Sequence, residues 1–310
     1  MEQGFVVDFS RIDQTVRGTT METHLSPAQV ARALGVSESS LKRWCDQGFI
    51  PIVRTVGGHR KLPIASVLAF VRERGKTLVE PELLGLPAVT GRSVVTLERA
   101  VETLTGILQK SEPDQARRVV FDLYLAGHGL AAICDQVLAV IFQRLGIAWE
   151  CGELEIYRER RACEIVYRLL NELLLALPPV PLAAPLALGA TLPSDYYQLP
   201  STMVELVLRE QGWQARSLGC NLPAATLIAA LREQRPKLFW LSASHIRDTS
   251  EFVSEFNQLA EAAQALKIPI ILGGRALTSE LRQQLEFTAC CENLRELQNL
   301  SLTLLQSEKK

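Results

Sequence analysis

The chain has 310 residues, of which 47% are hydrophobic and 22% charged. This composition is typical of globular proteins with a substantial core, and the length allows two or three domains. The longest apolar stretches are broken by prolines and a glutamate, which excludes a conventional membrane span, and the N-terminus lacks the pattern of a signal peptide. The seven cysteines are scattered and form no CxxC pair. We therefore expect a cytoplasmic protein with reduced thiols and no membrane partner.

The net charge of −1 conceals an uneven distribution of charge along the chain. Residues 23–76 hold nine Lys and Arg against three Asp and Glu, a net charge of +6, so the remainder is acidic. A basic segment within an otherwise acidic chain indicates a part that binds nucleic acid.

Two short helices are predicted in this basic segment, after a mobile arm over residues 1–22 that lacks strong periodicity. The first helix begins after Ser26, which can form a capping box with Gln29. The second begins after Ser37, and only the three residues "GVS" join the two. This arrangement is typical of a helix-turn-helix motif.

A small hairpin is predicted next, in "IPIVRTVGGHRKLP", where β-branched residues flank Gly57 and Gly58. A further amphipathic helix, "IASVLAFVRERG", follows it. The motif, the hairpin and the local charge together predict a winged helix-turn-helix DNA-binding domain over residues 23–75.

The rest of the chain divides into a linker and two further domains. Residues 76–94 carry prolines and glycines without a period and are predicted to be a linker. Residues 95–180 contain four helical segments with short connections, which predict a four-helix bundle. Over residues 181–310, five apolar runs alternate with helical stretches, which predicts a Rossmann-like, five-stranded, doubly wound parallel sheet. The predicted fold class is multidomain, α and α/β.

The second helix and the hairpin carry the candidate DNA contacts. Leu41 and Trp44 should pack inward, so that the polar face of the helix turns toward DNA. Side chains on that face can reach base edges or phosphates, and a basic hairpin suits phosphate contacts beside the groove. The candidates are Ser39, Lys42, Arg43 and Gln47 on the helix, and Arg54, His59, Arg60 and Lys61 on the hairpin.

The stretch "ALGVSESSLKRWCDQGFIPIVRTVGGHRKLPIASVLAFV" resembles the DNA-binding domain of the MerR-type regulators, in its arginine-tryptophan pair, its "RT-x-GGHRK" hairpin and the helix that follows. A bundle followed by a five-stranded α/β domain resembles the cobalamin-binding module of methionine synthase. The whole combination is similar to the light-responsive, adenosylcobalamin-binding repressors of carotenoid genes. This resemblance implies a transcriptional regulator with a double-stranded DNA operator as its partner.

In that family the cofactor lies between the bundle and the α/β domain, and the histidine of an Asp-x-His-x-x-Gly motif ligates cobalt. In "SDYYQLP", Asp195 stands at the motif aspartate, but Tyr197 replaces the histidine and Pro200 the glycine. The family covers the upper face with a Trp-His and a Glu-His pair, and the nucleotide tail enters a slot near a serine-rich turn and a Gly-Gly pair. The corresponding positions are Trp149, Glu150, Glu159 and Arg160 in the bundle, and Ser242, Ser244, Gly273 and Gly274 in the α/β domain.

The replaced motif residues change the chemistry of the predicted pocket. A neutral imidazole is a good ligand for cobalt, whereas a phenol must first lose a proton whose unperturbed pKa is about 10. Pro200 fixes its own backbone and lacks the N–H of a glycine turn. We therefore expect that histidine-ligated cobalamin is not bound.

Three alternatives remain for the occupant of this pocket. It holds another chromophore or effector, such as a haem, a bilin or an anionic metabolite bound by Arg160; it holds no ligand and serves oligomerisation; or it binds cobalamin without a protein ligand to the cobalt. Of the candidate haem ligands, His245 follows the third strand at its carboxyl end, where doubly wound sheets bind ligands. The candidates are Tyr197, Cys151, His128 and His245.

The sequence gives little support to enzyme chemistry, because it shows no Ser-His-Asp order, phosphate-binding loop or paired metal motif. It predicts a transcriptional regulator that is not an enzyme, with a ligand-free DNA-binding scaffold as the rival class. A single reader covers one half-site, so we expect a homo-oligomer on DNA.

Overall fold

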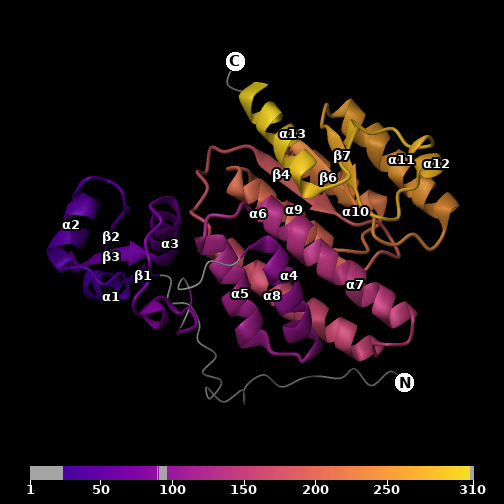
Figure 1. Ribbon diagram of the computed structural model, residues 1–310. Coiled ribbons are helices and arrows are strands. Elements are labelled where there is room, and N and C mark those ends of the chain that lie inside the picture. Colours follow the sequence, from indigo (N-terminus) through magenta and orange to yellow (C-terminus); the bar gives the residue numbers. More distant parts are fainter. Residues whose placement is uncertain (1–23, 89, 91–95, 308–310) are drawn as a thin grey trace, which may run out of the picture.

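The computed structural model describes residues 24–88, 90 and 96–307, and the arm predicted over residues 1–22 lies outside them. Three units follow one another along the described chain (Figure 1). We call residues 24–88 the head, residues 97–176 the bundle and residues 186–307 the α/β domain. The predicted combination of a helix-turn-helix unit, helices and a five-stranded parallel sheet is confirmed.

The head is a helix-turn-helix with a small sheet. Ser26 and Gln29 form the predicted capping box, and Ser37 caps the second helix by accepting from Ser40 N. The strand order is β1-β3-β2, so a short strand before the first helix joins the predicted hairpin. The elements are β1 (His24–Leu25), α1 (Pro27–Ala33), α2 (Glu38–Asp46), β2 (Val53–Arg54), β3 (Arg60–Pro63) and α3 (Ile64–Glu73).

The first half of the predicted linker packs against the head. The backbone N–H of Val79 donates to the carbonyl of Ala33 at the end of α1, at 2.8 Å. The short 3₁₀ helix η2 (Pro81–Leu84) also contacts α1. Three apolar side chains of the segment are buried: Leu78, Leu84 and Leu86. This part of the connection therefore belongs to the core of the head.

Helix α3 is buried on almost every side. One face closes the core of the head, and the other contacts α5 (Pro113–Leu125) and α8 (Ile156–Ala176) of the bundle. A helix that is apolar all round needs partners all round, and the hydrophobic core runs without interruption from the head into the bundle. The buried residues of α3 are Ile64, Ala65, Ser66, Val67, Leu68, Phe70 and Val71.

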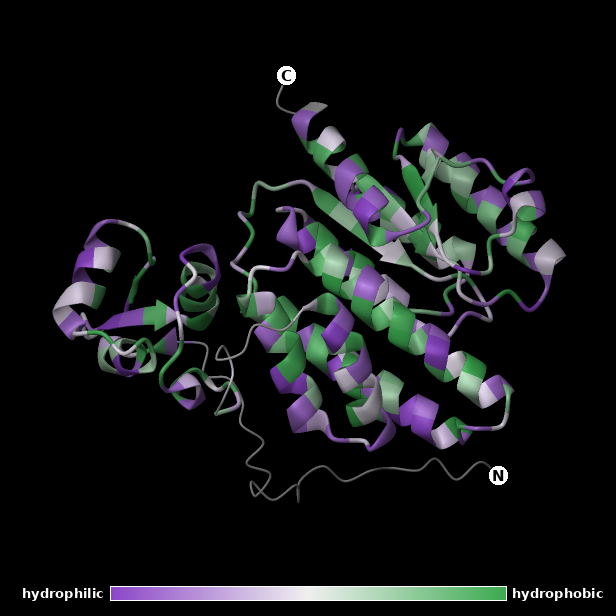
Figure 2. Cartoon of the chain, in the orientation of Figure 1, coloured by the Kyte–Doolittle hydropathy of each residue, from purple (hydrophilic) through white to green (hydrophobic). Residues whose placement is uncertain are grey.

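The bundle has the four predicted helical segments. The third runs from Leu130 to Glu150 without a break and contains a π-helical segment. This run is the one helix of the described residues that is long and apolar enough to cross a membrane by length and composition. It packs against α4 and α8, and Figure 2 shows hydrophilic residues interspersed along it. The elements are α4 (Leu97–Gln109), α5, α6 (Leu130–Ile133), η3 (Cys134–Leu138), α7 (Ala139–Glu150) and α8.

The α/β domain is a five-stranded parallel sheet of order β5-β4-β6-β7-β8, with helices on both faces. The strands are β4 (Leu186–Ala190), β5 (Gln214–Ser217), β6 (Leu238–Ser242), β7 (Ile270–Gly273) and β8 (Ala289–Cys290). The helices are α9 (Gln198–Glu210), α10 (Ala224–Gln234), α11 (Thr249–Ala265), α12 (Ser279–Arg282) and α13 (Leu294–Ser307). The strand order reverses between β4 and β6, and the loops after these strands meet at the position where such sheets bind ligands.

Carboxylates cap helices across the boundary between the bundle and the α/β domain. Asp135 in η3 accepts from the N–H groups of Leu294 and Arg295, both at 3.0 Å, at the start of α13. Glu210 at the end of α9 accepts from Leu130 N, at 3.0 Å, at the start of α6. The first N–H groups of a helix have no partner within it, so each domain completes a helix of the other.

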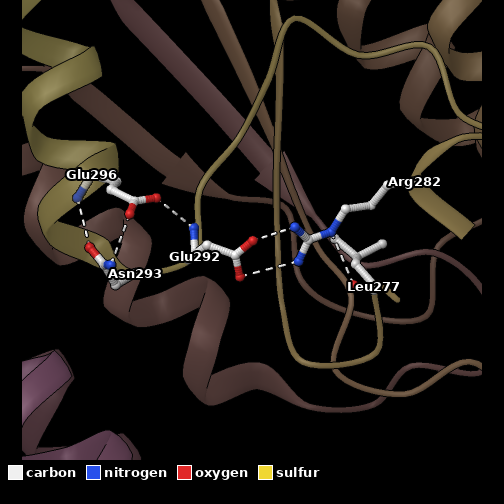
Figure 3. Close-up of polar contacts among 5 residues, drawn as sticks. All are labelled: Leu277, Arg282, Glu292, Asn293 and Glu296. Atoms are coloured by element: carbon white, nitrogen blue, oxygen red, sulfur yellow. Dashed lines mark hydrogen bonds and ion pairs between the residues drawn. The ribbon is translucent and has the colours of Figure 1, made fainter. Parts of the chain in front are cut away.

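The start of α13 is also held from within the α/β domain (Figure 3). Arg282 forms a two-pronged ion pair with Glu292, with 3.2 Å between Nη2 and Oε2, and its Nε donates to the Leu277 carbonyl at 3.0 Å. Glu292 N donates in turn to Glu296 at 2.8 Å. The hydrogen bond from Arg282 lowers the pKa of the Glu292 carboxyl. This network fixes the loop after β7 against the first turn of α13.

Gly189 should not tolerate a larger residue. It pairs with Trp240 across β4 and β6, and a Cβ added at Gly189 would lie 2.0 Å from the indole ring. We expect Gly189→Ala to lower the free energy of unfolding by about 1–3 kcal/mol, as overpacking of a core does, in a urea titration followed by circular dichroism. Gly106→Ala is the matched control, because its Cβ would meet nothing within 4 Å; equal destabilisation by both variants would contradict the packing described here.

Candidate functional site

The predicted DNA contacts lie around α2 and the hairpin of the head. Ser39 and Lys42 from α2 and Arg60 from β3 line one groove of about 440 Å³. Arg43 and Gln47 on α2 are exposed, as are Arg54 and His59 on the hairpin, and Lys61 is half-buried. Leu41 is fully buried as predicted, whereas Trp44 is only half-buried and packs on Phe70 with 5.0 Å between ring centroids.

The hairpin places two guanidinium groups opposite each other. Arg54 and Arg60 are directly paired across β2 and β3. Like charges in that position repel, and Asp46 at the end of α2 partly neutralises Arg60 at 3.3 Å. An anion beside the hairpin, such as a backbone phosphate, would relieve the remaining repulsion.

The switch point of the sheet is organised around the carboxylate of Asp195. Its Oδ1 accepts from Tyr197 N at 3.0 Å, and its Oδ2 accepts from Ser244 N at 2.7 Å and His245 N at 3.3 Å. Asp195 is 2% exposed. Burial raises the pKa of its carboxyl, and the three N–H donors act in the opposite direction. Asp195 therefore joins the loop after β4 to the loop after β6.

Tyr197 lies between positively charged groups from both domains. The guanidinium of Arg160, from α8, is 5.8 Å from the centroid of its ring, and that of Arg275, after β7, is 5.5 Å away. The ring of His245 lies 6.5 Å from it. Arg160 is therefore a point at which the bundle contacts the loop that carries Tyr197.

The serine-rich turn and the Gly-Gly pair contact each other directly. Ala243, between Ser242 and Ser244, donates its N–H to Gly273 O at 2.8 Å and accepts from Ala276 N at 3.0 Å. A Cβ at Gly274 would lie 2.2 Å from the Ala243 carbonyl oxygen. The two turns are therefore held against each other where the neighbouring strands β6 and β7 end.

The indole of Trp240 occupies the space above Gly189. Trp240 is 2% exposed, and its Nε1 donates to Ser201 Oγ on α9 at 3.0 Å. A glycine in a strand commonly marks the close approach of a ligand or of another chain segment. Here a tryptophan from the neighbouring strand supplies that group.

The bundle residues predicted to cover the pocket differ in their surroundings. Trp149 is 46% exposed, and Glu150 beside it is exposed. Glu159 is half-buried, accepts from Cys163 Sγ at 3.3 Å and lies 3.6 Å from Arg160. Of these four residues, Arg160 lies beside the loop of residues 194–200, because its guanidinium stands near the ring of Tyr197.

Of the four candidate haem ligands, Tyr197 and His245 lie close together, with 6.5 Å between their ring centroids. His128 and Cys151 lie far from each other. His128 precedes α6 and Cys151 follows α7, so a continuous helical run of about 30 Å separates them. His245 lines a polar pocket of about 350 Å³ with Ser244 and Thr278. No group of three or more His, Cys, Asp and Glu side chains within the described ranges could hold a metal ion.

Three residues that were not predicted from the sequence complete the site. Thr191 Oγ1 donates to the Asp195 carbonyl at 2.6 Å, and Asn221 Oδ1 accepts from Ser194 N at 2.8 Å. Arg275 was missed as well, although it directly follows the Gly-Gly pair. Its position in the sequence was a usable signal, whereas Asn221 comes from a loop more than twenty residues away.

Comparisons with known proteins agree with this architecture. Residues 25–75 match the helix-turn-helix domain family, and residues 185–292 match the B12 binding domain family. The chain is 26% identical to the HTH-type transcriptional repressor CarA of Myxococcus xanthus over 260 residues, 82% of this chain and 87% of the relative. It is 28% identical to the HTH-type transcriptional repressor CarH of the same organism over 289 residues, 85% of this chain and 91% of the relative. The chain is homologous to these repressors.

Two further matches concern the C-terminal part. Methionine synthase of Mycobacterium tuberculosis is 24% identical over 89 residues, which is 29% of this chain and 8% of the enzyme. The monomethylamine corrinoid protein of Methanosarcina barkeri superposes with a TM-score of 0.54 at 17% identity, covering 67% of this chain and 100% of that one. The second match shows that the bundle and the α/β domain share a common fold with that protein.

The residues present do not fit the histidine-ligated corrinoid that a B12 binding domain implies. The position predicted for the cobalt ligand holds Tyr197, with two guanidinium groups within 6 Å of the centroid of its ring. These positive charges repel a metal cation and so disfavour its binding at this position. The space above Gly189 holds Trp240, and the two turns predicted to border the tail slot pack backbone to backbone.

Replacing Asp195 with asparagine should destabilise the site loops. An amide nitrogen does not accept hydrogen bonds, so at least one of the three N–H donors loses its partner, and the donor of Ser244 is buried. We expect Asp195→Asn to lower the free energy of unfolding by about 1–3 kcal/mol, measured in urea at pH 7. Asp248→Asn is the matched control, because Asp248 caps α11 by accepting from Glu251 N, at 2.9 Å, and asparagine caps equally well. Equal stability of Asp195→Asn and the wild type would refute the role of Asp195.

Proposed function

We propose that the chain is a DNA-binding transcriptional regulator whose bundle and α/β domain form a cobalamin-type sensor module. The observation that carries the proposal is the basic face of a helix-turn-helix head whose core continues into that module. The chain aligns with the two HTH-type transcriptional repressors along most of their length. A regulator of this kind is not an enzyme, and we infer that it acts on DNA as a homo-oligomer, since one head covers one half-site.

We infer that the sensor module works without histidine-ligated cobalamin. Tyr197, its flanking guanidinium groups and the buried indole of Trp240 support this inference. Two arginines beside an aromatic ring at the switch point favour an anionic effector over a metal centre. Binding of such an effector between Arg160 and Arg275 would change how the bundle packs on the α/β domain.

The head should bind duplex DNA in a sequence-specific and salt-dependent manner. We expect Arg43→Ala to weaken binding of the full chain to its selected operator by roughly 1–3 kcal/mol, if the exposed guanidinium reads a base. Fluorescence anisotropy across a range of salt concentrations measures this. Arg32→Ala is the control, since it removes the same charge from α1, where Arg32 pairs with Glu80 at 2.6 Å. Equal affinity of Arg43→Ala and the wild type would show that Arg43 on α2 does not read a base. Absence of salt-dependent DNA binding would refute the proposed function.

Adenosylcobalamin should not bind in the histidine-ligated form. We expect the full chain, mixed with adenosylcobalamin in the dark and passed over a gel-filtration column, to elute without the cobalamin absorption spectrum. The reason is the lack of an imidazole ligand at Tyr197 together with the filled space above Gly189. Tyr197→His alone should not restore binding, because Trp240 and the backbone contact at Gly274 remain. Stoichiometric, light-labile cobalamin eluting with the wild type would overturn this inference.

A further inference from the structure

Arg72, near the end of α3, is the place where the head meets both other units. Its Nη2 lies 2.9 Å from Oε1 of Glu210, at the end of α9, and donates to the His128 carbonyl, before α6, at 3.0 Å. Its Cζ lies 4.6 Å from the centroid of the Tyr124 ring on α5. One side chain of the head therefore contacts the bundle and the α/β domain at once.

This contact is largely removed from water. The side chains of Arg72 and Glu210 are 19% and 13% exposed, and Tyr124 is 1% exposed. Burial raises the pKa of the Tyr124 phenol, so the ring stays neutral beside the guanidinium. An ion pair of this kind is screened by salt much less than a surface pair, and it holds its geometry only while both partners are present.

Other arginines of the head have partners within the head and the segment packed on it. Arg60 pairs with Asp46, Arg32 pairs with Glu80, and Arg74 stacks on Phe49 with 4.2 Å from its Cζ to the ring centroid. Arg72 differs because it contacts His128 and Tyr124 of the bundle and Glu210 of the α/β domain. It is suited to hold the head in one orientation.

Helix α9 links this contact to the candidate effector site. It begins directly after Tyr197, and it ends at Glu210, whose other oxygen accepts from Leu130 N. A helix of 13 residues is a stiff connection of about 20 Å. A displacement of the Asp195 loop would therefore move the carboxylate that holds Arg72.

The docked head leaves its recognition helix free to meet DNA. Figure 1 shows α3 on the side of the head nearest the bundle and α2 on the far side. We propose that Arg72, held by Glu210, is a positioning residue that fixes the orientation of the head on the sensor module, and so sets the spacing at which paired heads fit two half-sites. The second part of this inference rests on the proposed function.

Small-angle X-ray scattering of the full chain tests the positioning directly. Arg72→Met keeps the apolar length of the side chain and removes the charge, and Glu210→Gln removes the charge from the opposite side of the contact. We expect both variants to show a larger radius of gyration and a broader distribution of interatomic distances than the wild type. Arg74→Met is the matched control, since it removes the same charge from the same end of α3, and its scattering should match the wild type.

DNA binding supplies the second readout. Duplexes carry two copies of the selected half-site at spacings that vary by single base pairs. We expect the wild type to prefer one spacing over those shifted by about half a helical turn, roughly five base pairs. Arg72→Met and Glu210→Gln should reduce that preference severalfold, while their affinity for a single half-site stays within about twofold.

The outcomes separate this inference from the proposed function. Unchanged scattering for both Arg72→Met and Glu210→Gln would overturn the positioning role. If Arg72→Met does not fold, as judged by circular dichroism, Glu210→Gln decides, because its remaining oxygen can still cap α6. A wild type that binds no DNA would refute the proposed function, and scattering would still decide whether Arg72 positions the head. If Arg72→Met or Glu210→Gln shows the larger radius of gyration but keeps the spacing preference of the wild type, the claim that Arg72 sets the half-site spacing is overturned alone.

Discussion

Backbone N–H groups whose carboxylate acceptors belong to a different segment of the chain hold this molecule together. Asp135 completes the first turn of α13, Glu210 completes the first turn of α6, and Asp195 joins two loops of the sheet. A buried donor that loses its acceptor costs about 1–3 kcal/mol. The bundle and the α/β domain are therefore difficult to separate, and any signal must pass as a small coordinated shift. The candidate effector site lies at the start of helix α9, and the contact with the head lies at the end of the same helix.

Features encoded by neighbouring residues could be predicted from the sequence. The capping box of Ser26 and Gln29 lies within four residues, and Ser37 caps α2 in the same local manner. Four of the five strands are short apolar runs between turn residues, whereas β5 is mostly polar, and the sheet forms from all five. The sequence predicted Asp195 in a polar loop between a strand and a helix, and the structure has it in the loop between β4 and α9. Such loops lie at the carboxyl ends of the strands in this fold.

Features that depend on residues far apart in the sequence could not be predicted. Asp195 receives hydrogen bonds from residues about fifty positions later, and Trp240 reaches Gly189 only through the register of two strands. Helix α3 was predicted to be amphipathic, as a helix with one covered face would be. In the structure both of its faces are covered, and the apolar residues of "IASVLAFV" on the second face meet the bundle. The pairing of Arg72 with Glu210 joins two units, the head and the α/β domain, and has no local signature.

The burial of α3 on both faces limits how freely this DNA-binding head can be exchanged between proteins. A head cut out after residue 75 would expose an apolar helix face that the bundle normally covers, and such a surface promotes self-association. A fusion to an unrelated sensor would need a complementary apolar surface and a carboxylate for Arg72. We expect the outer face of α3 to vary between homologues in step with α5 and α8, which it contacts, rather than with the operator.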